Sequence, residues 1–250
     1  VAAFKRTKQP QLDILKTRKS QLETRQQFLT GLRSRLESLQ LQTDKFNDTN
    51  LTEKLIKKTA TQSNAEYAEI TINGKPNIDS FEYNVNRLAE FDIMVSNRID
   101  RNSNFIYSGE QKSMTLMGQT YDFTFESDES NESAMQKVVK AINTKEDGLL
   151  SAALVRDTTN TFRISFTSKN IGANDAISFE DSEILSFLGV ISDEINSDLE
   201  NRKIFSSTQA GFKKSSAALL NSEINVNGIN VVRNSNSIND LFDGVEIKLK

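Results

Sequence analysis

NSEINVNGINVVRNSNSINDLFDGVEIKLK, residues 221–250, carries the clearest structural signal in the chain. The dipeptide Asn227-Gly228 stands between two apolar stretches, and both residue types tolerate the positive φ that a type I′ turn requires. A two-residue turn at this point predicts a β-hairpin with three opposed pairs: Val226 with Ile229, Ile224 with Val231, and Asn225 with Asn230. The apolar pairs share one face of this hairpin, so that face is expected to cover a core.

The rest of this stretch predicts one helical turn and then a strand. Asn236 and Ser237 form a helix-capping pair, and apolar residues follow at the i, i+3, i+4 spacing of a helix: Ile238, Leu241 and Phe242. Asp243-Gly244 is expected to end that turn. Apolar residues then alternate with charged ones, which predicts a strand with one face in water: Val245, Ile247 and Leu249.

A long helix is predicted from residue 11 to about residue 46, with Pro10 suited to its start. Leucines at heptad a and d positions form a row along it, here called the leucine row: Leu15, Leu22, Leu29, Leu32, Leu36 and Leu39. Arg18 and Arg25 occupy the two earlier d positions. At 1.5 Å per residue this helix would be ~54 Å long, so we expect it to pack on partner helices or on another subunit. A bundle helix of any soluble protein would show the same pattern.

The middle of the chain predicts a compact module, residues 113–190, in which one helix covers an antiparallel sheet. The apolar stripe of that helix comprises Ala134, Met135, Val138, Val139 and Ile142. Alternating strands are expected before the module at residues 68–72, 81–85 and 91–95. Phe91, Ile93 and Val95 share one face of the last of these. Residues 192–206 are charged and are expected to form a helix leading into a linker.

The composition excludes several kinds of chemistry. The 250 residues include no Cys and no His, which excludes disulfides, thiol catalysis, the usual zinc sites and His-based catalysis. A net charge of −3 gives no basic field for nucleic acid. No apolar run approaches the ~18 residues that a membrane span needs.

One cluster of carboxylates was a candidate metal site: Asp128, Glu129 and Glu132. It lacks the glycine-pinned spacing of a calcium loop, so we interpret it as a solvated turn. No phosphate-binding loop, dinucleotide-binding turn or nucleophile elbow is present. We therefore expect no catalytic residue, no cofactor and no metal ligand.

Three regions resemble, in order, the flagellar hook-associated protein 2 family, the FliD-type filament cap proteins. The first resembles the family's strand ending in Val-x-x-Leu-Ala, with Val85, Leu88 and Ala89, although Arg87, Glu90 and Phe91 depart from its usual Gln. The second resembles the family's hook-type repeat, with matches at Ile142, Asn143, Ala153, Val155, Ile164, Thr167, Ser168 and Gly172-Ala173. The third is the C-terminal stretch, with matches at Val226, Asn227, Gly228, Arg233, Ser235, Asn236, Ile238, Asp240, Leu241, Gly244, Val245 and Leu249.

This resemblance implies an α+β fold with a long N-terminal helix, part of a helical bundle domain, followed by two β-rich domains, the second inserted in the first. The implied domains are 1–54 for the helix of a D1-type helical domain, 55–110 plus 203–250 for a discontinuous β-rich domain, and 111–202 for the inserted α+β domain. The start VAAFKRTKQP has no initiator Met and no apolar signal core. We therefore expect a fragment that lacks both terminal coiled-coil parts.

The resemblance also implies a structural, non-enzymatic role: a ring at the distal end of the flagellar filament that promotes insertion of flagellin. The implied partners are further copies of the chain, flagellin and neighbouring hook–filament junction proteins, with no nucleic acid and no membrane insertion. The implied location is the flagellum outside the cell, or the periplasm where flagella are internal. Two alternatives stay open: another flagellar axial or junction protein, and a β-rich surface adhesin or carbohydrate-binding module, which aromatic residues clustered on one exposed face would favour.

Overall fold

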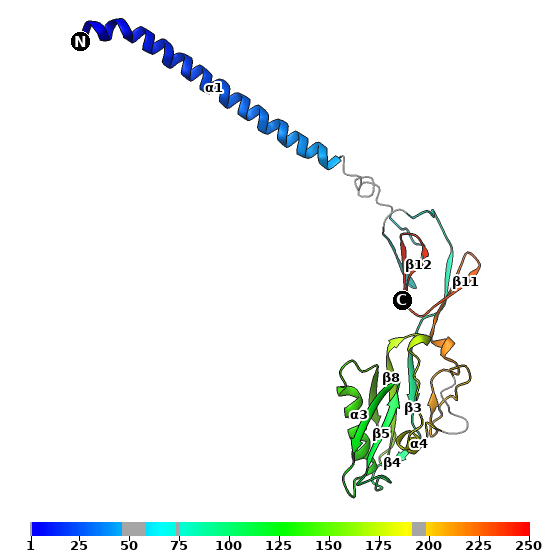
Figure 1. The fold of residues 1–250 in the computed structure, drawn as a ribbon. Helices are drawn as coiled ribbons and strands as arrows, with labels where there is room; N and C mark the ends of the chain where they lie inside the picture. Colours follow the sequence, from blue (N-terminus) through cyan, green and yellow to red (C-terminus); the bar gives the residue numbers. More distant parts are fainter. Residues whose placement is uncertain (1, 47–58, 74–75, 192–198) are drawn as a thin grey trace. The chain divides into compact units, whose positions relative to one another are not determined.

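The computed structural model describes residues 2–46, 59–73, 76–191 and 199–250, with the side chains of the first helix from residue 8 to residue 44. The chain divides into two compact units, residues 1–58 and 59–250. Within the described residues, the first unit is one long helix and the second, here called the β-rich unit, holds every strand (Figure 1). An α+β fold with a long N-terminal helix is thereby confirmed. The expected end of the helical domain at residue 54 lies outside the described residues.

Helix α1 (Ala2–Phe46) begins earlier than expected. Pro10 lies inside the helix, so the prediction that it marks the start was wrong. The residues before it, AAFKRTKQ, are mostly good helix formers, and Pro10 removes one backbone hydrogen bond without stopping the next turn. Every described side chain of α1 is exposed, so this helix buries no core of its own within its unit.

Two three-stranded sheets enclose the smaller core of the β-rich unit, here called the small core. Their strand orders are β1–β13–β12 and β11–β10–β2. The bounds are β1 (Ala68–Ile72), β2 (Tyr83–Arg87), β10 (Ser222–Val226), β11 (Ile229–Arg233), β12 (Ser237–Phe242) and β13 (Val245–Leu249). The fully buried side chains of the small core are Ala68, Ile224, Val226, Val231, Ile238, Val245, Ile247 and Leu249.

The hairpin of β10 and β11 has the predicted register. Val226 pairs with Ile229, Ile224 with Val231 and Asn225 with Asn230. β1 and β13 come from opposite ends of the β-rich unit and pair antiparallel over five residues, with Ala68 opposite Leu249 and Ile72 opposite Val245. The first and last strands of the unit therefore complete one sheet together.

A larger core, here called the large core, lies among a sheet, a hairpin and two helices. The sheet has the order β4–β8–β3–β9, and β7 also pairs with β8, while β5 and β6 form the hairpin. The bounds are β3 (Phe91–Val95), β4 (Ile99–Asp100), β5 (Gln111–Leu116), β6 (Gln119–Thr124), α3 (Asn131–Thr144), β7 (Leu150–Val155), β8 (Thr161–Ile171), α4 (Glu183–Phe187) and β9 (Gly211–Phe212). Two short 3-10 helices, η1 (Ala173–Asp175) and η2 (Ala217–Leu220), complete the described elements.

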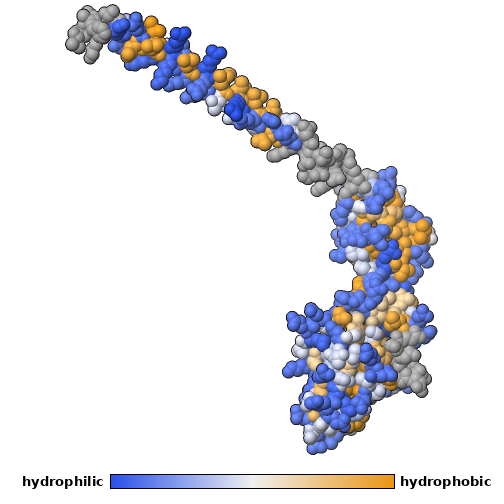
Figure 2. All heavy atoms as spheres, viewed as in Figure 1, coloured by the Kyte–Doolittle hydropathy of each residue, from blue (hydrophilic) through white to orange (hydrophobic). Residues whose placement is uncertain are grey.

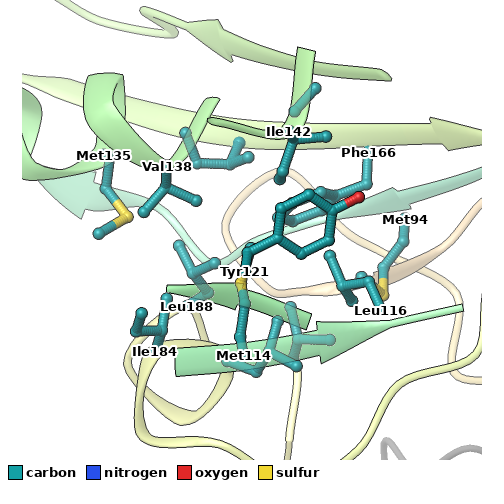
Figure 3. Packing of buried hydrophobic residues seen from close by; sticks show 14 of the residues in the cluster. Met94, Met114, Leu116, Tyr121, Met135, Val138, Ile142, Phe166, Ile184 and Leu188 are labelled. Carbon is teal, nitrogen blue, oxygen red and sulfur yellow. The ribbon is translucent and has the colours of Figure 1, made fainter. Parts of the chain in front are cut away.

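The predicted stripe of α3 packs into this large core. Ala134, Met135, Val138 and Ile142 are buried there, and Val139 packs against its edge. Figure 3 shows Met135 and Val138 from the helix turned toward Met114 of the β5–β6 hairpin and Leu188. Ser130 caps the helix by accepting a hydrogen bond from the Ser133 amide at 3.3 Å. One helix thus covers a sheet here, as the sequence predicts.

Residues 237–242 form strand β12, so the prediction of a helical turn there was wrong. Ile238 pairs with Ile247 and Phe242 pairs with Val245, with a register shift between the two pairs. That shift lets the helix-like apolar spacing fit a bulged strand, because the extra residues change which side chains face inward. Phe242 then packs against Phe81, with ring centroids 5.0 Å apart.

Strand β3 has the opposite inward face from the one expected. Asp92 and Met94 are fully buried, whereas Phe91 is exposed. The apolar alternation of Phe91, Ile93 and Val95 does not reveal this, because the buried polar position is stabilised by a partner from a distant part of the sequence.

The domain boundaries inside the β-rich unit stay a proposal. Strands β3 and β9 lie outside residues 111–202, yet both belong to the sheet of β8. Met94 and Phe212, from these two strands, are buried in the large core. We therefore propose that the inserted region begins near residue 90 and ends near residue 220. The first part of the expected helix at 192–206, residues 192–198, lies outside the described residues, and the rest of that range contains no helix.

Candidate assembly surface

The leucine row of α1 is exposed along its whole length. The exposed fractions of its six side chains run from 45% at Leu32 to 64% at Leu15. Figure 2 shows apolar residues gathered on the visible side of this helix. Large apolar side chains rarely stay in water in such a long row, so the surface is suited to docking another helix.

Polar groups on α1 do little to cover the row. Leu22 and Leu29 line a shallow groove together with Arg25, Gln26, Thr30 and Arg33. Two ion pairs run along the same helix, Lys19–Glu23 at 3.7 Å and Arg33–Glu37 at 2.8 Å. Both pairs are well exposed, and such pairs contribute about 0.3–0.5 kcal/mol each to a helix.

Asn227 and Gly228 form the turn that the family pattern predicts. Their φ angles are 51° and 86°, both in the left-handed region. A Cβ on Gly228 would meet no atom within 4 Å, so the backbone angle alone favours glycine there. The Asn227 side chain accepts a hydrogen bond from the Glu82 amide at 2.9 Å, and the Asn227 amide donates to the Glu82 carbonyl at 3.0 Å. Asn227 therefore ties the hairpin to the chain entering β2.

Asn236 binds another part of the chain through both ends of its amide group. Its Oδ1 accepts from the Ala89 amide at 2.7 Å, and its Nδ2 donates to the Ala89 carbonyl at 3.1 Å. Asn143, also a family-pattern residue, does the same to Ala152, with both distances 2.8 Å. Each asparagine side chain thus supplies the hydrogen bonds that a neighbouring strand would otherwise give to this backbone. Buried backbone N–H and C=O groups need such partners.

Asp240, Leu241 and Gly244 of the C-terminal family pattern also have structural roles. Arg233 donates from Nε to both carboxylate oxygens of Asp240 at 3.0 Å, and this hydrogen bonding lowers the Asp240 pKa. Leu241 packs against the small core. Gly244 has φ 70°, an angle that favours glycine. A Cβ there would also lie only 2.7 Å from the Asn73 carbonyl oxygen, so both the backbone angle and the space require glycine. The pattern residues Asn227, Gly228, Asn236, Asp240, Leu241 and Gly244 therefore all stabilise the part of the β-rich unit around the small core.

A buried ion pair in the β-rich unit was missed by the sequence analysis. Asp92 on β3 accepts from Arg202 at 2.5 Å and from the Ile177 amide at 2.8 Å, and both side chains of the pair are fully buried. The Arg202 guanidinium also lies 3.5 Å from the ring centroid of Phe212. Asp92 interrupts an otherwise apolar strand, and that interruption was the only sequence signal of the pair.

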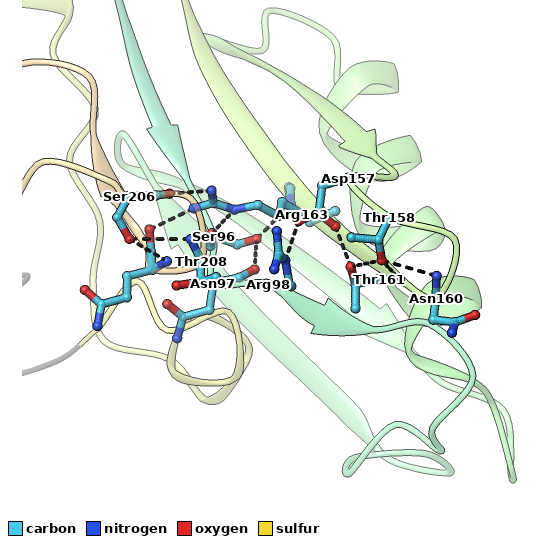
Figure 4. A network of polar contacts seen from close by, with 12 residues as sticks. Ser96, Asn97, Arg98, Asp157, Thr158, Asn160, Thr161, Arg163, Ser206 and Thr208 are labelled. Carbon is cyan, nitrogen blue, oxygen red and sulfur yellow. Dashed lines mark hydrogen bonds and ion pairs between the residues drawn. The ribbon is translucent and has the colours of Figure 1, made fainter.

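Arg163 on β8 was also missed. It donates to three carbonyl oxygens, those of Ser96, Ser206 and Gln209, at 2.6–2.8 Å (Figure 4). Burial lowers the pKa of this guanidinium, and the nearby Asp157 opposes that effect. The bonds to Ser206 and Gln209 hold the loop at residues 206–209 against the sheet, so Arg163 has a structural role.

Two of the three candidate carboxylates, Glu129 and Glu132, are largely buried and form ion pairs, so the interpretation as a solvated turn was wrong for both. Glu132 accepts from Arg101 at 2.8 Å and from Arg156 at 2.6 Å, and these two bonds lower its pKa. Burial raises the pKa of Glu129, but hydrogen bonds from Ser133, Lys137 and the Glu126 amide outweigh it and lower the pKa overall. Among the described residues, no group of three or more acidic side chains could hold a metal ion. No described helix is long and apolar enough to span a membrane.

Comparisons with known proteins find one family model and several similar folds. Residues 1–92 match the family model for the N-terminus of flagellar hook-associated protein 2. No curated protein sequence matches the chain. The fold is similar to the flagellar cap protein FliD D2-D3 domains from Escherichia coli, with a TM-score of 0.54 and 17% identity over 76% of this chain and 92% of that one.

Two further solved structures have the same fold. FliD (HAP2) from Pseudomonas aeruginosa PAO1 matches with a TM-score of 0.55 and 20% identity, over 74% of this chain and 78% of that chain. The D2-D3 domains of the flagellar cap protein from Serratia marcescens match with a TM-score of 0.51 and 20% identity, over 74% and 93%. The N-terminal residues thus match the hook-associated protein 2 family model, and the β-rich unit has the fold of flagellar cap protein D2-D3 domains.

Proposed function

We propose that several copies of this protein form a ring at the distal end of the flagellar filament and promote the insertion of flagellin beneath it. The leucine row of α1 is the observation that carries this proposal. An assembly that uses the row would bury six leucines, and burial of one leucine side chain contributes about 1.5–3 kcal/mol. The row is accordingly the assembly surface, packing on helices outside residues 1–250 or on neighbouring subunits.

We propose that this function needs no reactive group. The distinctive buried polar residues, Asp92, Arg163 and Arg202, are committed to contacts within the β-rich unit. Promotion of insertion would then depend on many weak surface contacts acting together, as multivalent binding does. Flagellin and the neighbouring hook–filament junction proteins are the partners that this mechanism requires.

We propose a location on the flagellum outside the cell, or in the periplasm where flagella are internal. The absence of Cys suits a protein that is exported unfolded and does not depend on disulfides for stability. Of the exposed aromatic side chains in the β-rich unit, Tyr67, Phe91 and Phe205 come from different parts of the sequence. Most of the other described aromatics in that unit lie in or against the two cores, which favours a structural role over a carbohydrate-binding one.

The test is a pair of matched substitutions in the full-length protein. Leu29→Asp with Leu36→Asp places two charges in the leucine row, whereas Leu41→Asp places one on an equally exposed leucine outside it. We expect the double variant to be exported but to cap poorly, so that cells release flagellin monomers and lose motility, while Leu41→Asp cells swim normally. Normal motility and normal subunit association in the double variant would refute the assembly role of the row.

A further inference from the structure

Two arginines interrupt the leucine row in its N-terminal half. In heptad register, the d positions of α1 are Arg18, Arg25, Leu32 and Leu39, and all four side chains are exposed. Arg18 and Arg25 make no ion pair or hydrogen bond with any described residue, whereas Lys19 and Arg33 each pair with a glutamate. Two unpaired cations one heptad apart therefore lie in the contact surface itself.

The positions that flank the row supply no carboxylate. The e positions from residue 19 to residue 40 are Lys19, Gln26, Arg33 and Gln40. The g positions from residue 14 to residue 42 are Ile14, Gln21, Phe28, Arg35 and Gln42. Across the a, d, e and g positions from residue 14 to residue 42 there are thus five cations and no acid.

The acidic side chains of the same stretch lie on the other side of α1. Asp13 occupies an f position, and Glu23, Glu37 and Asp44 occupy b positions, which point away from a coiled-coil partner. Glu23 and Glu37 are already paired with Lys19 and Arg33. None of them is available to a helix that docks on the leucine row.

A second copy of α1 is a poor occupant for this surface. In a parallel pair, Arg18 and Arg25 would face their own counterparts. In an antiparallel pair they would lie among leucines, and the flanking positions would offer only lysine, arginine, glutamine or apolar groups. Either arrangement brings like charges together without a carboxylate, which opposes association.

We propose that the leucine row docks a different helix, one that carries two carboxylates spaced one heptad apart opposite Arg18 and Arg25 and apolar residues opposite Leu29 to Leu39. This inference rests on the proposed assembly role of the row and states the chemistry of its partner. Arginine binds a carboxylate through two parallel hydrogen bonds, which fixes geometry as well as charge. A partner displaced by one heptad toward residue 39 would place a carboxylate against Leu32, so the two arginines also set the register of the assembly.

The test uses synthetic helical peptides of about four heptads, with leucine at their a and d positions and glutamine at e and g. Two consecutive d positions carry Glu in one peptide, Gln in the second and Lys in the third. Titrated onto the 250-residue protein, the Glu peptide should bind at least ~10-fold more tightly than the Gln peptide, with the Lys peptide weakest. In the Arg18→Glu, Arg25→Glu variant the order should reverse. Lys16→Glu is the matched control, because Lys16 lies two residues before Arg18 at a b position that points away from the docked helix. This variant should keep the original order of peptide affinities.

Each other outcome is decisive. Equal binding of the Glu and Lys peptides would overturn the inference about the arginines while leaving the leucine row as a docking surface. No binding of any peptide would overturn the assembly role of the row itself. Sedimentation analysis that shows a tight dimer of the protein, lost in the Leu29→Asp, Leu36→Asp variant and kept in Leu41→Asp, would show that a second copy is the occupant and overturn the proposal.

Discussion

Leucine occupies opposite environments in the two units of this chain. In the β-rich unit, Leu150, Leu185, Leu188 and Leu220 have no exposed surface, whereas on α1 Leu22 and Leu29 are 63% and 54% exposed. Apolar residues recur at regular spacing in both units. The spacing alone therefore does not distinguish a row that is buried in a core from one that has no partner. The difference shows that the β-rich unit is stabilised within itself, while the apolar surface of α1 is available to other helices.

Arginine provides the sharpest test of this contrast. Arg202→Met should lower the free energy of unfolding of the β-rich unit by about 3–5 kcal/mol, because it leaves the buried Asp92 carboxylate without its cation. Arg25→Met, on the exposed face of α1, should change the same quantity by less than about 0.5 kcal/mol. Urea denaturation followed by near-ultraviolet circular dichroism measures both. Equal effects would mean that the buried pair contributes nothing specific to this unit.

A pair of leucine truncations tests the same contrast through packing. Leu188→Ala removes a fully buried side chain from the large core and should cost about 2–5 kcal/mol of unfolding free energy. Leu29→Ala should leave the unfolding of the β-rich unit unchanged, because the buried side chains of both cores belong to that unit itself. Thermal and urea denaturation of the two variants would check this. A comparable loss from Leu29→Ala would show that the helix supports the β-rich unit.

The smallest expected effect is on the acid sensitivity of the β-rich unit's stability, through the ion pairs of Glu132. The two arginine hydrogen bonds lower the pKa of Glu132 below its ordinary value, so their stabilisation is complete above about pH 4.5 and is lost as the pH falls through the folded-state pKa. Glu132→Gln should remove about 1 kcal/mol or less at neutral pH. The variant should also lose part of the wild-type decline in stability below about pH 4.5. Glu37→Gln on α1 is the matched control, and an identical pH profile for Glu132→Gln and wild type would contradict the prediction.

Local signals predicted the local elements well. The β10–β11 hairpin follows from Asn227-Gly228 because the required turn angles and the pairing register are both set within a few residues. The stripe of α3 was predicted for the same reason, since one helix face carries the whole pattern. The leucine row was visible in the sequence, and its exposure was expected, because its partner helices were expected to come from elsewhere.

Elements that depend on distant partners were not predictable in the same way. Residues 237–242 fit a helical turn or a bulged strand equally well, and pairing with β13 decides between them. The burial of Asp92 depends on Arg202, which arrives much later in the chain and is itself surrounded by polar residues. The tie between Asn236 and Ala89 likewise joins positions far apart in sequence. Periodicity carries no information about such pairs.

The pairing of β1 with β13 has a consequence for the timing of folding. β1 is among the first segments of the β-rich unit in sequence, yet the strand that pairs with it is the last. A chain that enters its folding compartment from the N-terminus therefore cannot complete this sheet until nearly all of the unit has arrived. Closing so long a loop slows folding, since non-local contacts form late. Until then, one edge of β1 stays unpaired and open to pairing with another chain.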